Sequence, residues 1–174
     1  MSILPISTTF LTFGHNYNQP TNLPNNIKYV IFGNRYNQPT TLPLSIFFIK
    51  FGRDYHQPTI LPSNIKYVFF GRNFNQPIDL PHSIINLSLG YYYNQPDTIL
   101  PPYLQNFHFE NINNYDQYKD QLMKNRYLVY TNISDEDEDI SKHIDINGHN
   151  LTKLAMNLLS QCLCVIDEHD VDGC

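Results

Sequence analysis

Residues 27–43 read IKYVIFGNRYNQPTTLP, and this stretch decides the fold because nearly the same sequence recurs along the chain. Its apolar residues keep fixed places, in the pattern I-x-x-V-x-F-G-x-x-Y-N-Q-P-x-x-L-P. Val30 and Phe32 are separated by one residue, which is the alternation of a short strand with one face turned inward. The matching residues of the next units are Ile46, Ile49, Phe51 and Tyr55, then Ile65, Val68, Phe70 and Phe74, then Ile84, Leu87, Leu89 and Tyr93.

The units repeat every 19 residues, and only the last copy slips, by one residue before Pro101. Strands this short cannot bury a face alone, so successive units must stack and pair in parallel. We therefore predict a mainly β fold, a parallel-strand solenoid over residues 1–110, followed by a small α-helical region over 111–174. The markers of the period are Gly14, Gly33, Gly52, Gly71 and Gly90, then Pro20, Pro39, Pro58, Pro77 and Pro96, and Pro5, Pro24, Pro43, Pro62 and Pro81.

The remaining repeated residues shape the turns of each unit. The glycine at the strand end is expected to allow a turn with positive φ. Each proline removes a backbone donor and fixes its own φ, which keeps the return side from becoming a helix or a ladder. The asparagine of each N-Q-P triplet is expected to point inward and to satisfy backbone groups of its own and the next unit. This position holds Asn18, Asn37, Asn75 and Asn94, with His56 as the exception.

Composition narrows the class of protein. The 174 residues include 14% aromatic and only 16% charged residues, so the signature of disorder is missing. A net charge of -5 argues against nucleic-acid binding. The N-terminus, MSILPISTTF, lacks the features of a secretory signal, and no apolar run reaches the length of a membrane span. An odd number of clustered cysteines favours a reducing interior, so we expect an intracellular, cytoplasmic protein.

The segment FGRNFNQPIDLPHSI, Phe70 to Ile84, resembles the FNIP repeat, and the resemblance covers roughly residues 3–110. FNIP repeats occur in proteins of social amoebae and of giant viruses that infect amoebae, and they are regarded as similar to leucine-rich repeats. The resemblance implies an interaction scaffold, with a host protein as the partner and the host cytoplasm as the location if the chain is viral. In several family members the array follows an N-terminal F-box, which would make the array a substrate receptor for a ubiquitin ligase. Here the first unit begins at Ile3, so no F-box is expected before it.

Residues between the inward ones face away from the core, and in a leucine-rich-like coil they form the usual binding face. The first strands place a large aromatic and aliphatic patch there, whereas the later ones supply Asn86, Ser88, Asn106 and His108. Exposed apolar patches often mark interfaces. Three alternatives stay open: the patch binds a partner, the C-terminal third covers it, or its residues reflect β-propensity alone. The candidate partner-binding residues are Tyr29, Ile31, Phe48, Lys50, Tyr67 and Phe69.

The period stops after Glu110. Tyr115, Tyr118 and Leu122 have helical spacing after Asn113-Asn114 as an N-cap, and this helix is expected to cap the solenoid. SDEDED, residues 134–139, is a solvated charge run that lacks the glycine and glutamate of a calcium loop. Residues 151–165 place Leu151, Leu154, Leu158, Cys162 and Val165 near one stripe of an amphipathic helix, which either packs on the protein or binds a partner.

The two parts also differ in charge. Residues 1–110 carry six Lys or Arg against four Asp or Glu, and residues 111–174 carry five against twelve. The acidic part is expected either to fold over the faintly basic array or to reach a basic partner.

No nucleophile–base pair, phosphate-binding loop or metal-ligand spacing stands out, so we predict no catalytic residues, no metal and no cofactor. The sequence thus favours a non-enzymatic protein-interaction scaffold that uses the strand face. Two alternatives remain, a substrate-recognition adaptor of a ubiquitin ligase and a carbohydrate-binding module that uses the exposed aromatic residues.

Overall fold

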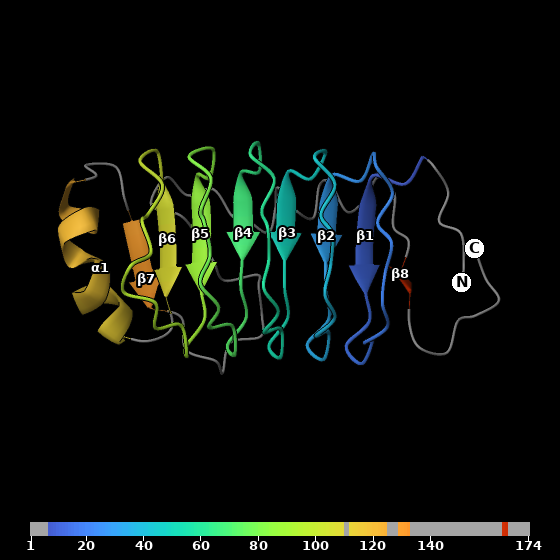
Figure 1. Ribbon diagram of the computed structural model, residues 1–174, viewed down its shortest axis with the longest axis horizontal. Helices are drawn as coiled ribbons and strands as arrows, with labels where there is room; N and C mark the ends of the chain where they lie inside the picture. The colour runs from blue at the N-terminus through green and yellow to red at the C-terminus, as the bar shows by residue number, and fades with distance from the viewer. Residues whose placement is uncertain (1–6, 110–111, 125–128, 133–164, 167–174) are drawn as a thin grey trace.

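A computed structural model describes residues 7–109, 112–124, 129–132 and 165–166. Its strands form one parallel sheet along the long axis of the molecule, and α1, Ile112–Lys124, lies at one end (Figure 1). Over the described residues the sheet has eight strands in the order β7-β6-β5-β4-β3-β2-β1-β8, so β1 to β6 pair in sequence order. The strands are β1 Phe10–Phe13, β2 Tyr29–Ile31, β3 Phe48–Lys50, β4 Tyr67–Phe69, β5 Asn86–Leu89, β6 Asn106–Phe109, β7 Val129–Asn132 and β8 Val165–Ile166.

Register follows the repeat. Tyr29 pairs with Phe48 and Phe48 with Tyr67, a step of one unit each time. The inserted residue before Pro101 shifts the next step, so that Asn86 pairs with Asn106. The prediction of a parallel-strand solenoid is therefore confirmed, and we call each 19-residue unit a coil.

Four rows of inward side chains fill the solenoid, one residue of each row per coil. The strand row has no exposure from Leu11 to Phe107, and the phenylalanine row that follows it is at most 2% exposed. Neighbouring rings in the phenylalanine row stack at 4.9–5.4 Å between centroids. The inward alternation read from the sequence is thus confirmed. The rows are Leu11, Val30, Ile49, Val68, Leu87 and Phe107; Phe13, Phe32, Phe51, Phe70 and Leu89; Ile27, Ile46, Ile65, Ile84 and Leu104; and Tyr17, Tyr36, Tyr55, Phe74 and Tyr93.

Glycine follows the strands because of close packing between coils, and not because of a turn with positive φ. Gly33, Gly52, Gly71 and Gly90 do not have positive φ, so that prediction is wrong for them. A Cβ on any of them would instead lie 2.0–2.2 Å from the carbonyl oxygen of the glycine one coil earlier. The coils approach so closely at this corner that only glycine fits.

The N-Q-P corner forms the ladder that was predicted, but on the surface. The side-chain oxygen of Asn18 accepts the backbone N–H of Asn37 at 2.9 Å, and Gln38 Nε2 donates to the same oxygen at 3.1 Å. The same pair of bonds recurs between Asn75 and the Asn94–Gln95 pair. These asparagines are exposed or half-exposed, so the expectation that they point inward is wrong. They tie each coil to the next from outside.

His56 replaces the asparagine in one coil. It keeps the backbone hydrogen bond to the preceding coil and contacts the following coil through its ring nitrogens. Its backbone N–H donates to Asn37 Oδ1 at 3.0 Å. Gln76 Nε2 lies 2.8 Å from His56 Nε2, and because an amide nitrogen can only donate, His56 Nε2 accepts. Nδ1 therefore carries the proton and donates to the carbonyl oxygen of Asn73 at 2.9 Å.

A tyrosine–threonine pair closes the core of most coils. The hydroxyl groups of Tyr55 and Thr59 are 2.8 Å apart, and Thr59 donates its own hydrogen to the carbonyl oxygen of Gln57, so Tyr55 is the donor. Burial raises the pKa of Tyr55 to about 12, although the bond to Thr59 opposes the rise. In the next coil both hydroxyl groups are missing together, because Phe74 and Ile78 take the two positions.

This joint replacement predicts a strong coupling between the two hydroxyl groups. Thr59→Val leaves the buried Tyr55 hydroxyl without its acceptor and is expected to cost about 1–3 kcal/mol of unfolding free energy. Tyr55→Phe combined with Thr59→Val is expected to cost less than Thr59→Val alone, because no buried donor is then left over. Urea unfolding of the wild type, both single variants and the double variant measures the coupling. Additive costs would contradict this explanation.

The C-terminal elements correct two predictions and add a strand that was not predicted. The helix was predicted, but it starts at Ile112, so Asn113-Asn114 lie inside its first turn rather than at its N-cap. Val165, expected in an amphipathic helix, belongs to β8, which pairs in parallel with β1. β7 was not predicted at all and pairs with β6. Residues 151–164, the rest of that expected helix, and the run 134–139 lie outside the described residues.

α1 packs against the last coil, as a capping helix should. Tyr118 is fully buried, and its ring meets Phe107 edge-on at 6.0 Å. Tyr118 donates its hydroxyl hydrogen to the carbonyl oxygen of Gln95 at 2.8 Å. Gln121 donates to the carbonyl oxygen of Thr98 at 3.0 Å and accepts the N–H of Leu100 at 2.8 Å. The helix thus satisfies backbone groups that a further coil would otherwise reach.

Candidate functional site

The six candidate residues lie together on the outer face of three neighbouring strands. We call them the strand-face patch: Tyr29, Ile31, Phe48, Lys50, Tyr67 and Phe69. Register places them in two rows, Tyr29–Phe48–Tyr67 and Ile31–Lys50–Phe69. Every one of them is half-buried, and in each strand the two patch residues flank one fully buried inward residue.

Ring contacts make the patch continuous. Phe48 lies 6.5 Å from Tyr29, 6.2 Å from Tyr67 and 5.3 Å from Phe69, measured between ring centroids. Each ring therefore shields part of its neighbours, and the pKa of Tyr67 is raised by burial. The patch is a preformed apolar surface on a rigid parallel ladder.

Two further aromatic residues extend the patch and were missed in the sequence. Phe47 lies 6.0 Å from Tyr29 and 5.2 Å from Tyr67, so its ring bridges two strands of the patch. Phe10 continues the first row on β1, 6.2 Å from Tyr29, but only 4% of it is exposed. Phe47 could have been found, because it interrupts a position that Lys28 and Lys66 hold in the neighbouring units.

Polar residues replace the aromatic ones beyond β4. Asn86 and Asn106 continue the first row, and Asn106 Nδ2 donates to Asn86 Oδ1 at 3.2 Å. Ser88 and His108 continue the second row. The outer face thus changes from aromatic to polar along the array, which matches the division expected from the sequence.

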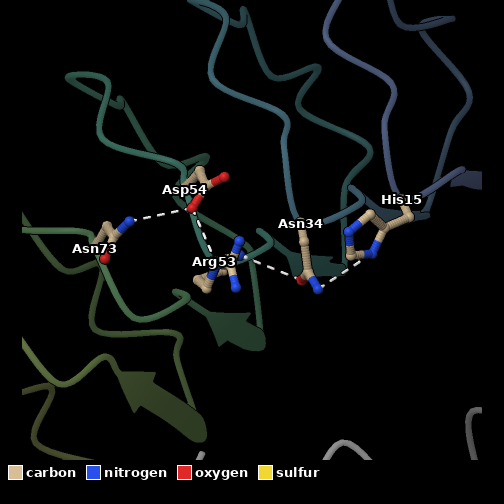
Figure 2. A network of polar contacts seen from close by, with 5 residues as sticks. All are labelled: His15, Asn34, Arg53, Asp54 and Asn73. Atoms are coloured by element: carbon tan, nitrogen blue, oxygen red, sulfur yellow. Dashed lines mark hydrogen bonds and ion pairs between the residues drawn. The ribbon is translucent and has the colours of Figure 1, made fainter.

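The turns that follow the strands carry a second surface feature, a polar ladder across four coils (Figure 2). Asn34 Nδ2 lies 3.4 Å from His15 Nδ1, and Asn34 Oδ1 accepts the backbone N–H of Arg53 at 3.4 Å. Asp54 Oδ1 accepts from Arg53 Nε at 3.1 Å and from Asn73 Nδ2 at 3.2 Å. These side chains are linked from coil to coil as a surface network rather than gathered around a cavity.

An arginine and two tyrosines continue this turn surface. The Arg72 guanidinium lies 5.0 Å from the ring centroid of Tyr91 and 5.7 Å from that of Tyr92. The two rings are perpendicular and remain 39% and 53% exposed. Because cations favour aromatic faces, these contacts hold the arginine beside the tyrosines.

Within residues 7–109 and the described segments after them, no three His, Cys, Asp or Glu side chains are placed to share a metal ion. The three cysteines lie outside the described residues. Among the described helices, none is long and apolar enough to cross a membrane.

The comparisons with known proteins bear on this arrangement of coils. The family model for the FNIP repeat matches five overlapping segments that together run over more than half of the chain, residues 2–35, 17–54, 36–73, 55–92 and 74–109. The chain belongs to the FNIP repeat family. The FNIP matches end where the period ends, at the last residue of β6.

A solved structure supports the same fold for the FNIP array. The giant-virus protein CroV588, described as a novel circular leucine-rich-repeat structure, matches at 38% sequence identity with a TM-score of 0.55. The match covers 61% of this chain and 18% of CroV588, so this FNIP chain spans less than a fifth of that protein. No curated protein matches the chain. The fold is leucine-rich-repeat-like, and a repeat scaffold of this kind is consistent with protein interaction.

Proposed function

We propose that this FNIP array is a non-enzymatic scaffold that binds a partner protein through the strand-face patch. The observation that carries the proposal is the unbroken aromatic cluster over β2, β3 and β4, with Phe48 at its centre. Tyrosine and phenylalanine offer much contact area for few rotatable bonds, which is why such residues anchor interfaces.

The backbone beneath the patch favours binding without reorganisation. Each patch strand is bonded on both sides in a parallel ladder, and the inward residues Val30, Ile49 and Val68 are fully buried. A surface that is already ordered loses little conformational entropy on association. On β5 the half-buried Ser88 follows Phe69 and ends the apolar row with a polar residue, whereas Asn86, which follows Tyr67, is buried.

Removal of the two central rings tests the proposal. In affinity capture from a lysate of the host cell, Phe48→Ala with Tyr67→Ala is expected to lose the specific partner, with a fall in affinity of about 100-fold or more. The melting temperature is expected to change little, because both rings are on the outer face.

The matched control removes two large apolar side chains from the return side of the coils. Leu44→Ala with Ile60→Ala changes residues that are 74% and 90% exposed, and the partner should be retained. Equal loss in both double variants would contradict binding at the strand face. Unfolding of the Phe48 and Tyr67 variant would show that these rings are internal packing.

A further inference from the structure

The cationic residues of the array lie on its strand side, whereas most of its carboxylates lie on the return side. All six lysines and arginines between residues 7 and 109 lie on the strands or in the few residues that flank them, whereas Asp79 and Asp97 lie on the return side and Asp54 alone shares the strand side. The six are Lys28, Arg35, Lys50, Arg53, Lys66 and Arg72. The side that carries the strand-face patch is therefore cationic, although the whole chain has a net charge of -5.

Two of the lysines frame the patch at the start of the strands. Phe47 donates its backbone N–H to the carbonyl oxygen of Lys28 at 2.9 Å, and Lys66 donates to that of Phe47 at 3.0 Å, so the three residues form one row. Neighbouring parallel strands are about 4.8 Å apart, which separates Lys28 from Lys66 by about 10 Å with the Phe47 ring between them. Lys50 lies within the patch itself, in the row of Ile31 and Phe69.

The opposite edge of the patch is cationic as well. Arg53 and Arg72 stand in successive turns after β3 and β4, and the side chain of Arg53 is 55% exposed. One carboxylate, that of Asp54, offsets Arg53. Aromatic rings between two cationic edges match a ligand that carries both apolar side chains and carboxylates.

We propose that the partner contacts the strand-face patch with an acidic, aromatic- or aliphatic-containing peptide segment. The inference rests on the proposed function and names the chemistry of its partner. The apolar side chains of the segment pack on Tyr29, Phe48 and Tyr67, and its carboxylates face Lys28 and Lys66. A nucleic acid fits less well, because its charges are spaced uniformly at about 3.4 Å per strand, whereas lysines of one row are about 10 Å apart.

Binding of defined polymers to the full chain tests this chemistry. Fluorescence anisotropy compares labelled poly(Glu,Tyr), poly-Glu, poly(Lys,Tyr) and a uridine oligonucleotide. Poly(Glu,Tyr) is expected to bind best, and its affinity should fall with salt because the charges are exposed. Tighter binding of the oligonucleotide, equal binding of poly(Lys,Tyr), or no binding of poly(Glu,Tyr) would each overturn the inference.

A charge-matched pair of variants locates the site. Lys28→Gln with Lys66→Gln is expected to weaken poly(Glu,Tyr) binding about five- to tenfold. Asn22→Glu with Ile60→Glu lowers the net charge by the same two units at exposed positions with the same sequence spacing on the return side, and should leave binding nearly unchanged. Equal weakening by both pairs would show a general charge effect and overturn the site.

Three results distinguish failure of the inference from failure of the proposed function. If Phe48→Ala with Tyr67→Ala loses the captured partner while Lys28→Gln with Lys66→Gln keeps it, the proposed function stands and the acidic class is wrong. If both double variants keep the captured partner, the proposed function and the acidic class of partner are both wrong. If poly(Glu,Tyr) binds only after the five carboxylates of residues 135–139 are replaced by amides, the occupant is the chain's own acidic run, and the partner inference fails.

Discussion

Gly52→Ala is expected to destabilise the protein by about 3 kcal/mol or more. The added Cβ would lie 2.2 Å from the carbonyl oxygen of Gly33, and this neighbour is backbone that cannot swing away like a flexible side chain. The next glycine, Gly71, stacks on Gly52 in the same way, so a shift of one coil would disturb both contacts. Urea unfolding followed by circular dichroism measures the loss.

Two comparisons separate close approach from other causes. Arg53→Ala changes the adjacent, exposed residue and should cost about 0.5 kcal/mol or less. Gly52→Asn distinguishes the two explanations for the glycine, because asparagine tolerates positive φ whereas it has a Cβ like alanine. We expect Gly52→Asn to be at least as harmful as Gly52→Ala. A clearly milder asparagine variant would contradict the contact explanation.

Phe51→Ala is expected to cost about 3–5 kcal/mol, the usual range for removal of a buried ring. Phe51 is 1% exposed and stacks at 5.4 Å on both Phe32 and Phe70, and its ring lies 3.8 Å from that of Tyr55. Each coil contacts only its neighbours, so a cavity in a central coil weakens the coupling between the two halves of the array. The unfolding transition should therefore also broaden.

The loss of unfolding free energy should depend on the size of the cavity. Phe51→Leu keeps most of the buried volume and is expected to cost about 1.5 kcal/mol or less. Phe48→Ala removes the same ring from the outer face and should cost less than Phe51→Ala, because Phe48 is only half-buried. If the two alanine variants cost the same, the inward and outward positions would be wrongly assigned.

The repeat allowed the core to be predicted because one period controls every coil. Val30, Phe32 and Tyr36 recur with the glycine and proline markers, so the inward rows and parallel pairing follow from the sequence. The half-buried outer position of the six patch residues follows from the same alternation, because outward residues alternate with inward ones. Binding of a partner at that patch stays a prediction. The outward side chains differ from coil to coil, so the repeat pattern does not indicate what they bind.

Other features could not be read because they depend on contacts between distant residues. A repeated glycine shows that side chains are excluded, but the close approach of Gly52 to Gly33 appears only when the coils are stacked. β7 lacks the glycine and proline markers, and β8 pairs with a strand about 150 residues earlier. Val165 has helical spacing with its neighbours, yet pairing with β1 places it in a strand.

Site-specific photo-crosslinking tests the central claim, partner binding at the strand face, most directly. A photoreactive phenylalanine analogue replaces Phe48 in the patch or Ile60 on the return side, and each variant is irradiated in the presence of the captured partner. We predict a covalent product from position 48 and none from position 60. Crosslinking from position 60 with none from position 48 would contradict binding at the strand-face patch.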